Sequence, residues 1–309
     1  MSQKPLRFRV PDIKFRVLVV GRANAGKTSI LQRVCETTES PKIYRINHMG
    51  RREEIRFTPT TERGDHDIED ELVFTNHDGY VFHDSCGFES GNEAELQIVQ
   101  NFVRKKATAR RLKDRLHAVW YCIPMENDRP ILDMKFFGVI CPDKNVPVIA
   151  VFTKYDQFKR DIKIKLAMRS GGRSLTAKDV DGEVEKVFQE QYWDVVKDES
   201  PRYVRLEKMH KVGERCDALI TETSNALSTN VATLMLLAVQ RGNLEISVRM
   251  AMERTSLDGN GLSKVKSCTK YFPHLWVCKN DFINEPWLTD YISFWWWMVR
   301  KIMQSLCLG

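Results

Sequence analysis

The segment 21–28 reads GRANAGKT and fits the pattern G-x-x-x-x-G-K-[ST], which is typical of loops that bind nucleotide phosphates. An apolar run at 15–20 precedes it, and apolar residues at helical spacing follow it. Glycines let the backbone turn so that successive N–H groups and a helix N-terminus face the anion. We expect Lys27 to neutralise the β- and γ-phosphates and the Thr28 hydroxyl to bind Mg²⁺. The residues expected to contact the nucleotide here are Gly21, Arg22, Ala23, Asn24, Ala25, Gly26, Lys27, Thr28 and Ser29.

A second apolar run occupies 146–152. The candidates for contacting the nucleotide base follow it directly: Thr153, Lys154 and Asp156. A carboxylate at Asp156 can accept hydrogen bonds from both N1–H and the exocyclic amine of guanine, and adenine does not offer this pair of donors. An unpaired buried carboxylate is costly, so the discrimination is strong. The Lys154 stem is expected to lie against the base. The pattern therefore favours GTP over ATP.

Between these two segments lies a D-x-x-G sequence, Asp84 to Gly87. We expect Asp84 to hold Mg²⁺ through water and the Gly87 N–H to meet the γ-phosphate. Thr60 and Thr61 lie in the preceding polar segment, and one of them is expected to supply a second hydroxyl for Mg²⁺, with Thr61 favoured.

A short apolar segment, 218–220, is the candidate last strand. Directly after it, Thr223, Ser224 and Asn225 are expected to offer backbone N–H groups to the guanine carbonyl.

Strand-like and helix-like segments alternate along the chain, which predicts a doubly wound α/β sheet. Strands are expected at 15–20, 71–74, 80–82, 116–123, 146–152 and 218–220, and helices at 27–35, 92–111, 131–140, 179–198 and 231–239. The Asp-Gly pair at 78–79 indicates a hairpin between two of the strands. The polar, basic segment 37–61 is expected to be a loop.

In their order, the motifs GRANAGKT, TT(E)RG, DSCG, TKYD and TSN resemble the G domain of P-loop GTPases. The Era-like and ribosome-binding GTPases, the septin-like relatives of the translation-factor class, and fungal G-domain-containing proteins are similar. The resemblance covers about residues 12–245. It implies binding of GTP and Mg²⁺, slow hydrolysis to GDP and phosphate, and nucleotide-responsive switch segments at about 37–66 and 84–106. Lys27, Thr61, Gly87 and Asn24 are then the candidate catalytic residues.

The fold that this resemblance implies is a three-layer α/β sheet of the P-loop NTPase type. The sheet is expected to be mostly parallel with one antiparallel strand, plus a helical insertion and a C-terminal helical tail. The expected domains are a GTP-binding domain at 12–255, with the helical insertion at about 157–215, and a Trp-rich extension at 256–309.

Two residues depart from the common pattern of this group. Phe88 stands directly after the D-x-x-G, where many small GTPases have a Gln that orients the attacking water. A K⁺ ion coordinated by Asn24 is one substitute that the resemblance suggests, and the alternative is that Asn24 only shapes the loop. Thr153 replaces the commoner Asn. Because of Phe88, a GTP-binding scaffold with little or no turnover is the alternative to a GTPase.

The chain has 309 residues, 42% of them apolar and 29% charged, with a formal net charge of +7. This composition excludes a disordered tail protein, a collagen-like fibre and a disulfide-rich miniprotein. Residues 1–60 carry +8, residues 61–100 carry −10 and residues 101–120 carry +6. The eight cysteines form no CxxC pair, and the first residues lack the apolar stretch of a signal peptide. An intracellular, cytoplasmic protein is therefore expected.

Partners other than the guanine nucleotide are open. Seven basic residues between 104 and 115 favour a helix end that complements the helix dipole, and RNA or an anionic membrane is the alternative. Acidic residues at 62–71 are candidates to face this cluster. Five of the seven Trp lie in the last 34 residues, on a helical stripe that is too short to span a bilayer. That helix is expected to pack on the domain, to associate peripherally with a membrane, or to contact a protein effector or a second copy in a nucleotide-dependent dimer.

Overall fold

The computed structural model describes residues 14–55, 67–75, 77, 79–85, 93–126, 134–171, 175–194, 202–228 and 231. The chain divides into two units, Met1–Met250 and Ala251–Gly309, and every described residue belongs to the first. The extension expected at 256–309 therefore lies outside the described residues, as does the helix expected at 231–239 apart from Val231.

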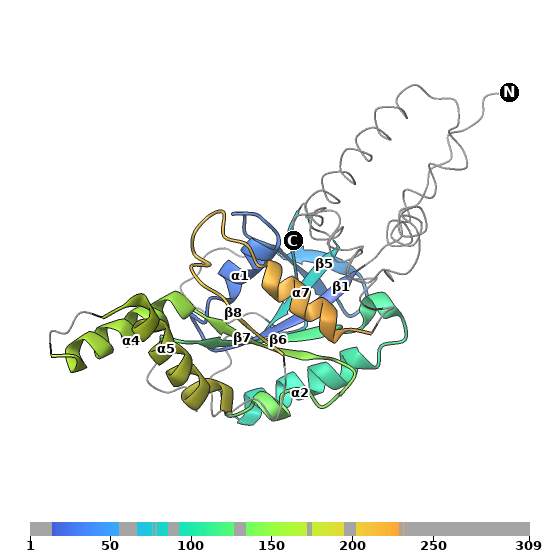
Figure 1. The fold of residues 1–309 in the computed structure, drawn as a ribbon. Coiled ribbons are helices and arrows are strands. Elements are labelled where there is room, and N and C mark those ends of the chain that lie inside the picture. Colours follow the sequence, from blue (N-terminus) through green and yellow to red (C-terminus); the bar gives the residue numbers. More distant parts are fainter. Residues whose placement is uncertain are drawn as a thin grey trace, which may run out of the picture. The chain divides into compact units, whose positions relative to one another are not determined.

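An eight-stranded sheet with the order β3-β2-β4-β5-β1-β6-β7-β8 organises the described unit (Figure 1). Its strands are β1 (Phe15–Val20), β2 (Lys42–Ile46), β3 (Arg52–Ile55), β4 (Glu71–Val73), β5 (Tyr80–Asp84), β6 (Ala118–Pro124), β7 (Val148–Thr153) and β8 (Tyr203–Arg205). The five neighbours β5, β1, β6, β7 and β8 are parallel. Every residue of β1 and β6 is buried, which explains why the central strands are nearly continuous apolar runs. The expected α/β fold with a mostly parallel sheet is confirmed.

The other side of the sheet is antiparallel. There β4 pairs with β5, β2 with β4 and β3 with β2, so that both β3 and β4 run against the parallel set. The hairpin between β4 and β5 is confirmed, but the expectation of one antiparallel strand is wrong.

The expectation of a loop at 37–61 is also wrong, since this segment contains the β2–β3 hairpin. Side chains on this hairpin are exposed or half-buried, so no apolar alternation marks its strands. Arg52, Glu53 and Glu54 place charges on the edge strand, as sheets that avoid edge-to-edge pairing do.

The helices are α1 (Lys27–Val34), α2 (Glu93–Ala107), α4 (Tyr155–Arg169), α5 (Ala177–Phe188) and α7 (Asp217–Ala226). Short 3₁₀ turns occur at Leu112–Asp114 and Phe137–Val139, the latter within the helix expected at 131–140. A π-helical turn, Gln189–Trp193, continues α5 into the region where a helix at 179–198 was expected.

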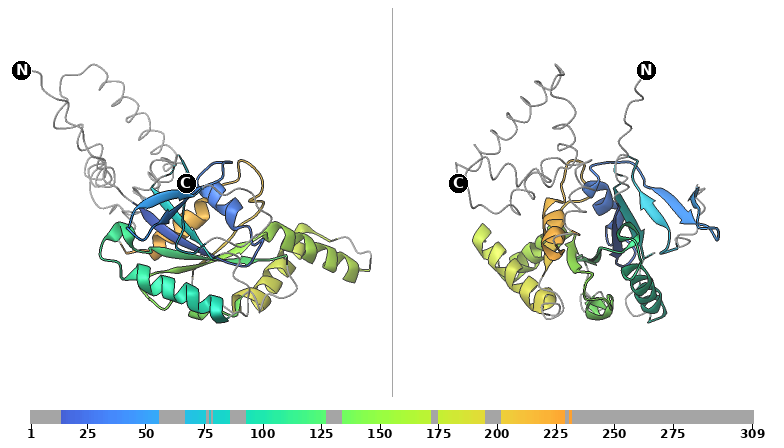
Figure 2. Two further views of the ribbon diagram at one scale, coloured as in Figure 1. Left: turned by 180° about the vertical axis from the view of Figure 1, so that it is seen from behind. Right: turned by 90° about the vertical axis from the view of Figure 1, so that its right-hand side faces the viewer.

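Helices cover both faces of the sheet, which makes a three-layer arrangement (Figures 1 and 2). On one face, Tyr121 of β6 and Phe152 of β7 pack in one core with Phe102 of α2 and Phe188 of α5. Residues of α4 join the same core. On the opposite face, α7 reaches β6 through a hydrogen bond from the Trp120 indole N–H. Alternate residues of the central strands therefore serve two separate cores.

The segment expected as a helical insertion, 157–215, is not helical throughout. It contains β8, so α4 and α5 form the connection between the parallel neighbours β7 and β8. Parallel strands require such a crossover. Arg205 of β8 fixes α5 to the sheet, because its guanidinium donates to both carboxylate oxygens of Glu185, at 2.7 and 2.8 Å, and lies 3.7 Å from the Phe188 ring centre.

The candidate strand at 218–220 is wrong as well, because these residues belong to α7. The buried residues of this region recur three or four positions apart, as on one face of a helix: Cys216, Leu219, Ile220, Thr223, Ser224 and Leu227. That spacing outweighs the short apolar run that suggested a strand.

Two buried histidines flank β1. The His117 Nδ1 accepts a hydrogen bond from the Arg16 backbone N–H at 2.9 Å. The His83 Nδ1 lies 3.0 Å from the Ile68 carbonyl and donates to it, and its Nε2 lies 3.3 Å from the Arg16 guanidinium. Burial, reinforced by that cation, lowers the pKa of His83 to about 3. Burial also lowers the pKa of His117 to about 4, and both rings stay neutral at pH 5.

Acidification from pH 6.5 to pH 5 is therefore expected to destabilise the fold. Below pH 6.5 the unfolded chain protonates both imidazoles and the folded chain does not, so the free energy of unfolding falls as the pH falls. Over this range each histidine contributes a loss of about 1.5 kcal/mol. Urea denaturation at several pH values measures this loss. A His83→Asn variant should lose a clear part of the pH dependence, and a variant with an unchanged slope would contradict the assignment.

Candidate functional site

The loop 21–28 connects β1 to α1 at the carboxyl end of the central strand (Figure 1). At Gly21 a Cβ would lie 2.7 Å from the Cys122 carbonyl oxygen of β6, so any side chain would collide with the neighbouring strand. Gly26 has φ 83° directly before α1, a conformation that favours glycine. The Ala25 N–H donates to the Arg22 carbonyl at 3.2 Å and closes the turn. The chain thus needs glycine at both ends of this loop.

Lys27 points back into its own loop. Its ammonium donates to the carbonyls of Gly21, at 2.7 Å, and Arg22, at 3.2 Å, and lies 3.6 Å from Asp84 Oδ1. Asp84 ends β5 and is in register with Val19 of β1, which explains why the carboxylate comes so close to the loop. The pairing of β5 with β1 therefore brings Lys27 and Asp84 together, although they are far apart in the sequence.

The N-terminus of α1 carries no side-chain cap and no acidic residue in its first turn. Such a terminus presents N–H groups and a partial positive charge. Thr28, the expected Mg²⁺ ligand, is exposed at this terminus. Asn24 is also exposed and has φ 62°. Burial raises the pKa of the nearby Cys122 to about 12 although Lys27 opposes the shift, so this thiol stays protonated.

The segment expected to read the base, 153–156, begins at the carboxyl end of β7. Thr153 is buried, and its hydroxyl donates to the Ala25 carbonyl at 2.9 Å, so the two predicted loops are joined directly. Lys154 has left-handed φ and ψ angles of 56° and 33° where α4 begins, and its ammonium is paired with the Glu126 carboxylate. The departure at Thr153 from the commoner Asn therefore has a structural role.

A cavity of about 220 Å³ lies between these loops. Residues from both motifs and from the segment after β8 line it: Gly26, Ser29, Ile30, Thr153, Lys154, Asp156, Gln157, Lys208, Met209 and His210. The Lys208 backbone N–H donates to Asp156 Oδ1 at 2.9 Å. The cavity therefore contains a carboxylate already held by a backbone donor, together with a lysine stem.

Lys208, Met209 and His210 are cavity residues that the sequence reasoning missed. They follow β8, which is the last of the described strands along the chain. The sequence predicts the last strand at 218–220 instead. The apolar pair Tyr203-Val204 between charged residues was the available signal, but three residues are too few for a clear strand pattern.

Thr223, Ser224 and Asn225 do not lie in a loop after a strand, because α7 contains all three. Thr223 is buried, its hydroxyl donates to the Leu219 carbonyl at 2.6 Å, and it accepts from Trp120 Nε1 at 3.0 Å. The expected role of these residues at the guanine carbonyl is thus not supported by their position, and Thr223 instead joins a helix to the sheet.

Thr223→Val is expected to lower the free energy of unfolding by about 1–3 kcal/mol, because the buried indole N–H of Trp120 would lose its acceptor. Chemical denaturation measures this loss. Nucleotide affinity should stay unchanged, and a selective loss of affinity without loss of stability would restore the base-reading role.

Four residues of the predicted site or next to it, Thr60, Thr61, Gly87 and Phe88, lie outside the described residues. The second Mg²⁺ hydroxyl and the γ-phosphate contact accordingly stay predictions. Among the described residues, no group of three or more His, Cys, Asp or Glu side chains is placed to hold a metal ion by itself.

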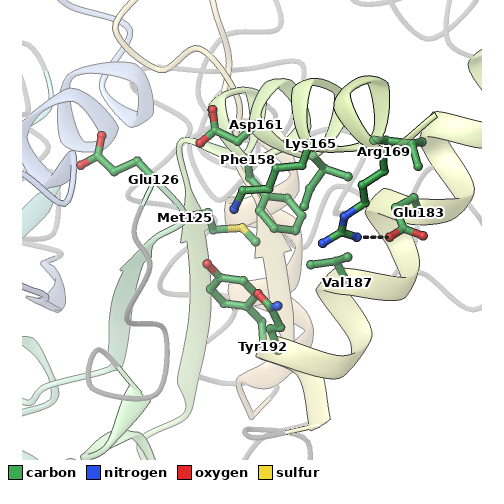
Figure 3. Close-up of a pocket in the computed structure, with 12 residues that line it drawn as sticks. Met125, Glu126, Phe158, Asp161, Lys165, Arg169, Glu183, Val187 and Tyr192 are labelled. Atoms are coloured by element: carbon green, nitrogen blue, oxygen red, sulfur yellow. Dashed lines mark ion pairs between the residues drawn. The ribbon is translucent and has the colours of Figure 1, made fainter. Parts of the chain in front are cut away.

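A second cavity, also about 220 Å³, lies between α4, α5 and the end of β6 (Figure 3). Its walls include Phe158, Tyr192 and Met125, with Lys165 directed inward from α4. None of the residues 21–29 lines it. Of these two cavities, only the one beside Gly26 is lined by residues of both predicted loops.

The basic cluster at 104–115 is partly neutralised within the fold. Lys105 and Lys106 lie 2.6 and 3.2 Å from the Glu69 carboxylate, which confirms for Glu69 that the acidic segment faces the cluster. Arg111 lies 2.6 Å from Asp114. In the part of the chain that the structure describes, no helix is both long and apolar enough to cross a membrane.

Comparison of the chain with protein-family models and with curated proteins finds no match in either set.

Proposed function

We propose that this chain is a GTP-binding switch protein that hydrolyses GTP to GDP and phosphate with Mg²⁺. The observation that carries the proposal is a convergence of residues at one edge of the sheet. There Lys27 lies 3.6 Å from Asp84, Thr153 bonds to the phosphate loop, and Asp156 lines a cavity beside Gly26. Ligands of open α/β sheets bind at the carboxyl ends of the strands, where these residues meet.

The residues present fit a phosphate group and its metal. The backbone at Gly21 leaves no room for a side chain, and the uncapped start of α1 suits an anion. In the proposed complex Lys27 exchanges its two carbonyl acceptors for phosphate oxygens. Thr28 and Asp84 would hold Mg²⁺, which neutralises phosphate charge when bound. The fold that we propose is accordingly that of the P-loop NTPases.

The proposed base specificity depends on Asp156. One oxygen, Oδ1, is fixed by the Lys208 N–H at 2.9 Å, and Arg160 lies 3.9 Å from the other. The Asp156 side chain is only 12% exposed, so an adenine base, which lacks the matching donors, would leave it partly desolvated without compensation. Guanine is the base that we expect in this cavity.

A scaffold that binds GTP with little turnover is the second candidate, and Phe88 favours it because its side chain cannot orient a water molecule. Phosphate release from GTP, measured with Mg²⁺ in Na⁺ and in K⁺ buffers, distinguishes the two. Turnover supports the GTPase, and faster turnover in K⁺ supports a cation at Asn24. Bound GTP without turnover in either salt would replace the GTPase by the scaffold.

We also propose an intracellular, cytoplasmic location. The support is chemical: Cys35, Cys122, Cys141 and Cys216 are free thiols, and free thiols are usual in reducing compartments.

A further inference from the structure

Glu126 connects two loops of the candidate site that are far apart in sequence. It lies just beyond β6, the strand between β1 and β7 in the sheet. Its Oε1 is paired with the Lys154 ammonium and lies 3.7 Å from Arg22 Nη2. One carboxylate oxygen thus contacts a side chain from the phosphate loop and a side chain from the base-reading segment.

The backbones of Lys154 and Arg22 both help to shape the two loops. Lys154 adopts a left-handed conformation, which is unfavourable for a residue with a side chain and is retained only where neighbouring contacts hold it. The Arg22 carbonyl accepts from the Lys27 ammonium at 3.2 Å and from the Ala25 N–H at 3.2 Å. Movement of either side chain would therefore affect residues that face the nucleotide.

The pairs are only partly shielded from solvent. The side chains of Glu126, Lys154 and Arg22 are 30, 23 and 24% exposed. Ion pairs at such exposure contribute little to global stability. Removal of these ion pairs is therefore expected to change the rate of nucleotide release more clearly than the free energy of unfolding.

We propose that Glu126 is a positioning residue for the guanine nucleotide: its carboxylate holds Lys154 along the base cavity and Arg22 beside the phosphate loop. This inference rests on the proposed function. Without the carboxylate, the Lys154 stem leaves its place beside the base more often, and the nucleotide dissociates faster. The bond from Thr153 to Ala25 still joins the loops, so the effect is moderate.

Stopped-flow release of a fluorescent GDP analogue tests the role. Glu126→Gln keeps the size of the side chain, removes its charge, and is expected to accelerate release about threefold to tenfold. In a Lys154→Met background the same substitution is expected to add less, because only the contact with Arg22 remains. Glu183→Gln is the matched control. Glu183 lines the α4–α5 cavity and pairs with Arg169, not with Lys154 or Arg22. The Glu183→Gln variant should release the GDP analogue at the rate of the unaltered chain.

Two results would overturn the inference while leaving the proposed function intact: unaltered or slower GDP release by Glu126→Gln, or an equal acceleration with and without Lys154. A fall in the melting temperature of the nucleotide-free chain that accounts for the faster release would also overturn it. Failure of the unaltered chain to bind GDP would instead overturn the proposed function, and this inference with it.

Discussion

Lys27→Met is expected to lower the affinity for GTP and GDP by about a hundredfold or more. Methionine reproduces the length of the lysine stem but offers no charge to the phosphates. Loss of charge-assisted hydrogen bonds to phosphate costs about 1.5–3 kcal/mol, which corresponds to one to two powers of ten in affinity. The Asp84 carboxylate would also lose the cation that lies 3.6 Å from it, which leaves more negative charge where the phosphates bind and enlarges the effect.

Titration calorimetry with GDP and Mg²⁺ measures this change, and Lys165→Met is the matched control. Lys165 is an exposed lysine in the wall of the α4–α5 cavity, so its replacement should leave affinity unchanged. Because Lys27 also donates to two loop carbonyls, the melting temperature of the nucleotide-free variant must be recorded as well. A folded Lys27→Met chain with undiminished affinity would show that the phosphates bind elsewhere.

Asp156→Asn is expected to shift the preference from GTP to xanthosine triphosphate. The change replaces an acceptor by a donor, so the two donors of guanine lose their partner while the additional carbonyl of xanthine gains one. A site built around specific hydrogen bonds rejects the mismatched ligand strongly, and we expect GTP affinity to fall by about a hundredfold or more. Competition of each nucleotide against a fluorescent analogue measures the switch.

Asp161→Asn provides the comparison for this experiment. It makes the same chemical change later on α4, at an exposed residue that lines the other cavity. Its nucleotide preference should match that of the unaltered chain. If Asp156→Asn kept its preference for GTP, the cavity beside Gly26 would not be the base site.

The central part of the fold was predictable from sequence because its signals are local and strong. The strands β1, β6 and β7 are buried on both faces and therefore appear as apolar runs, and the loop 21–28 has a fixed pattern between a strand and a helix. Lys154 and Asp156 could be assigned to one site with Lys27 for the same reason: the carboxyl ends of parallel neighbours meet at one edge.

The errors occur where tertiary contacts replace local pattern. The β2–β3 hairpin is held by pairing to β4 and is mostly exposed, so its sequence resembles that of a loop. The three-residue strand β8 has a weaker apolar pattern than the segment 218–220, so the sequence predicts neither β8 nor the cavity residues that follow it. Glu126 carries no motif at all, because its role depends on the proximity of Arg22 and Lys154 in space.

The most direct test of the central claim is to identify the nucleotide that accompanies the 309-residue chain when it is purified without added nucleotide. Denaturation of the protein and chromatography of the released small molecules are sufficient. The proposed function predicts GDP, alone or with GTP, and the loss of both from Lys27→Met. An adenine nucleotide in their place would contradict the claim, as would a nucleotide-free chain that binds neither GDP nor GTP in the presence of Mg²⁺.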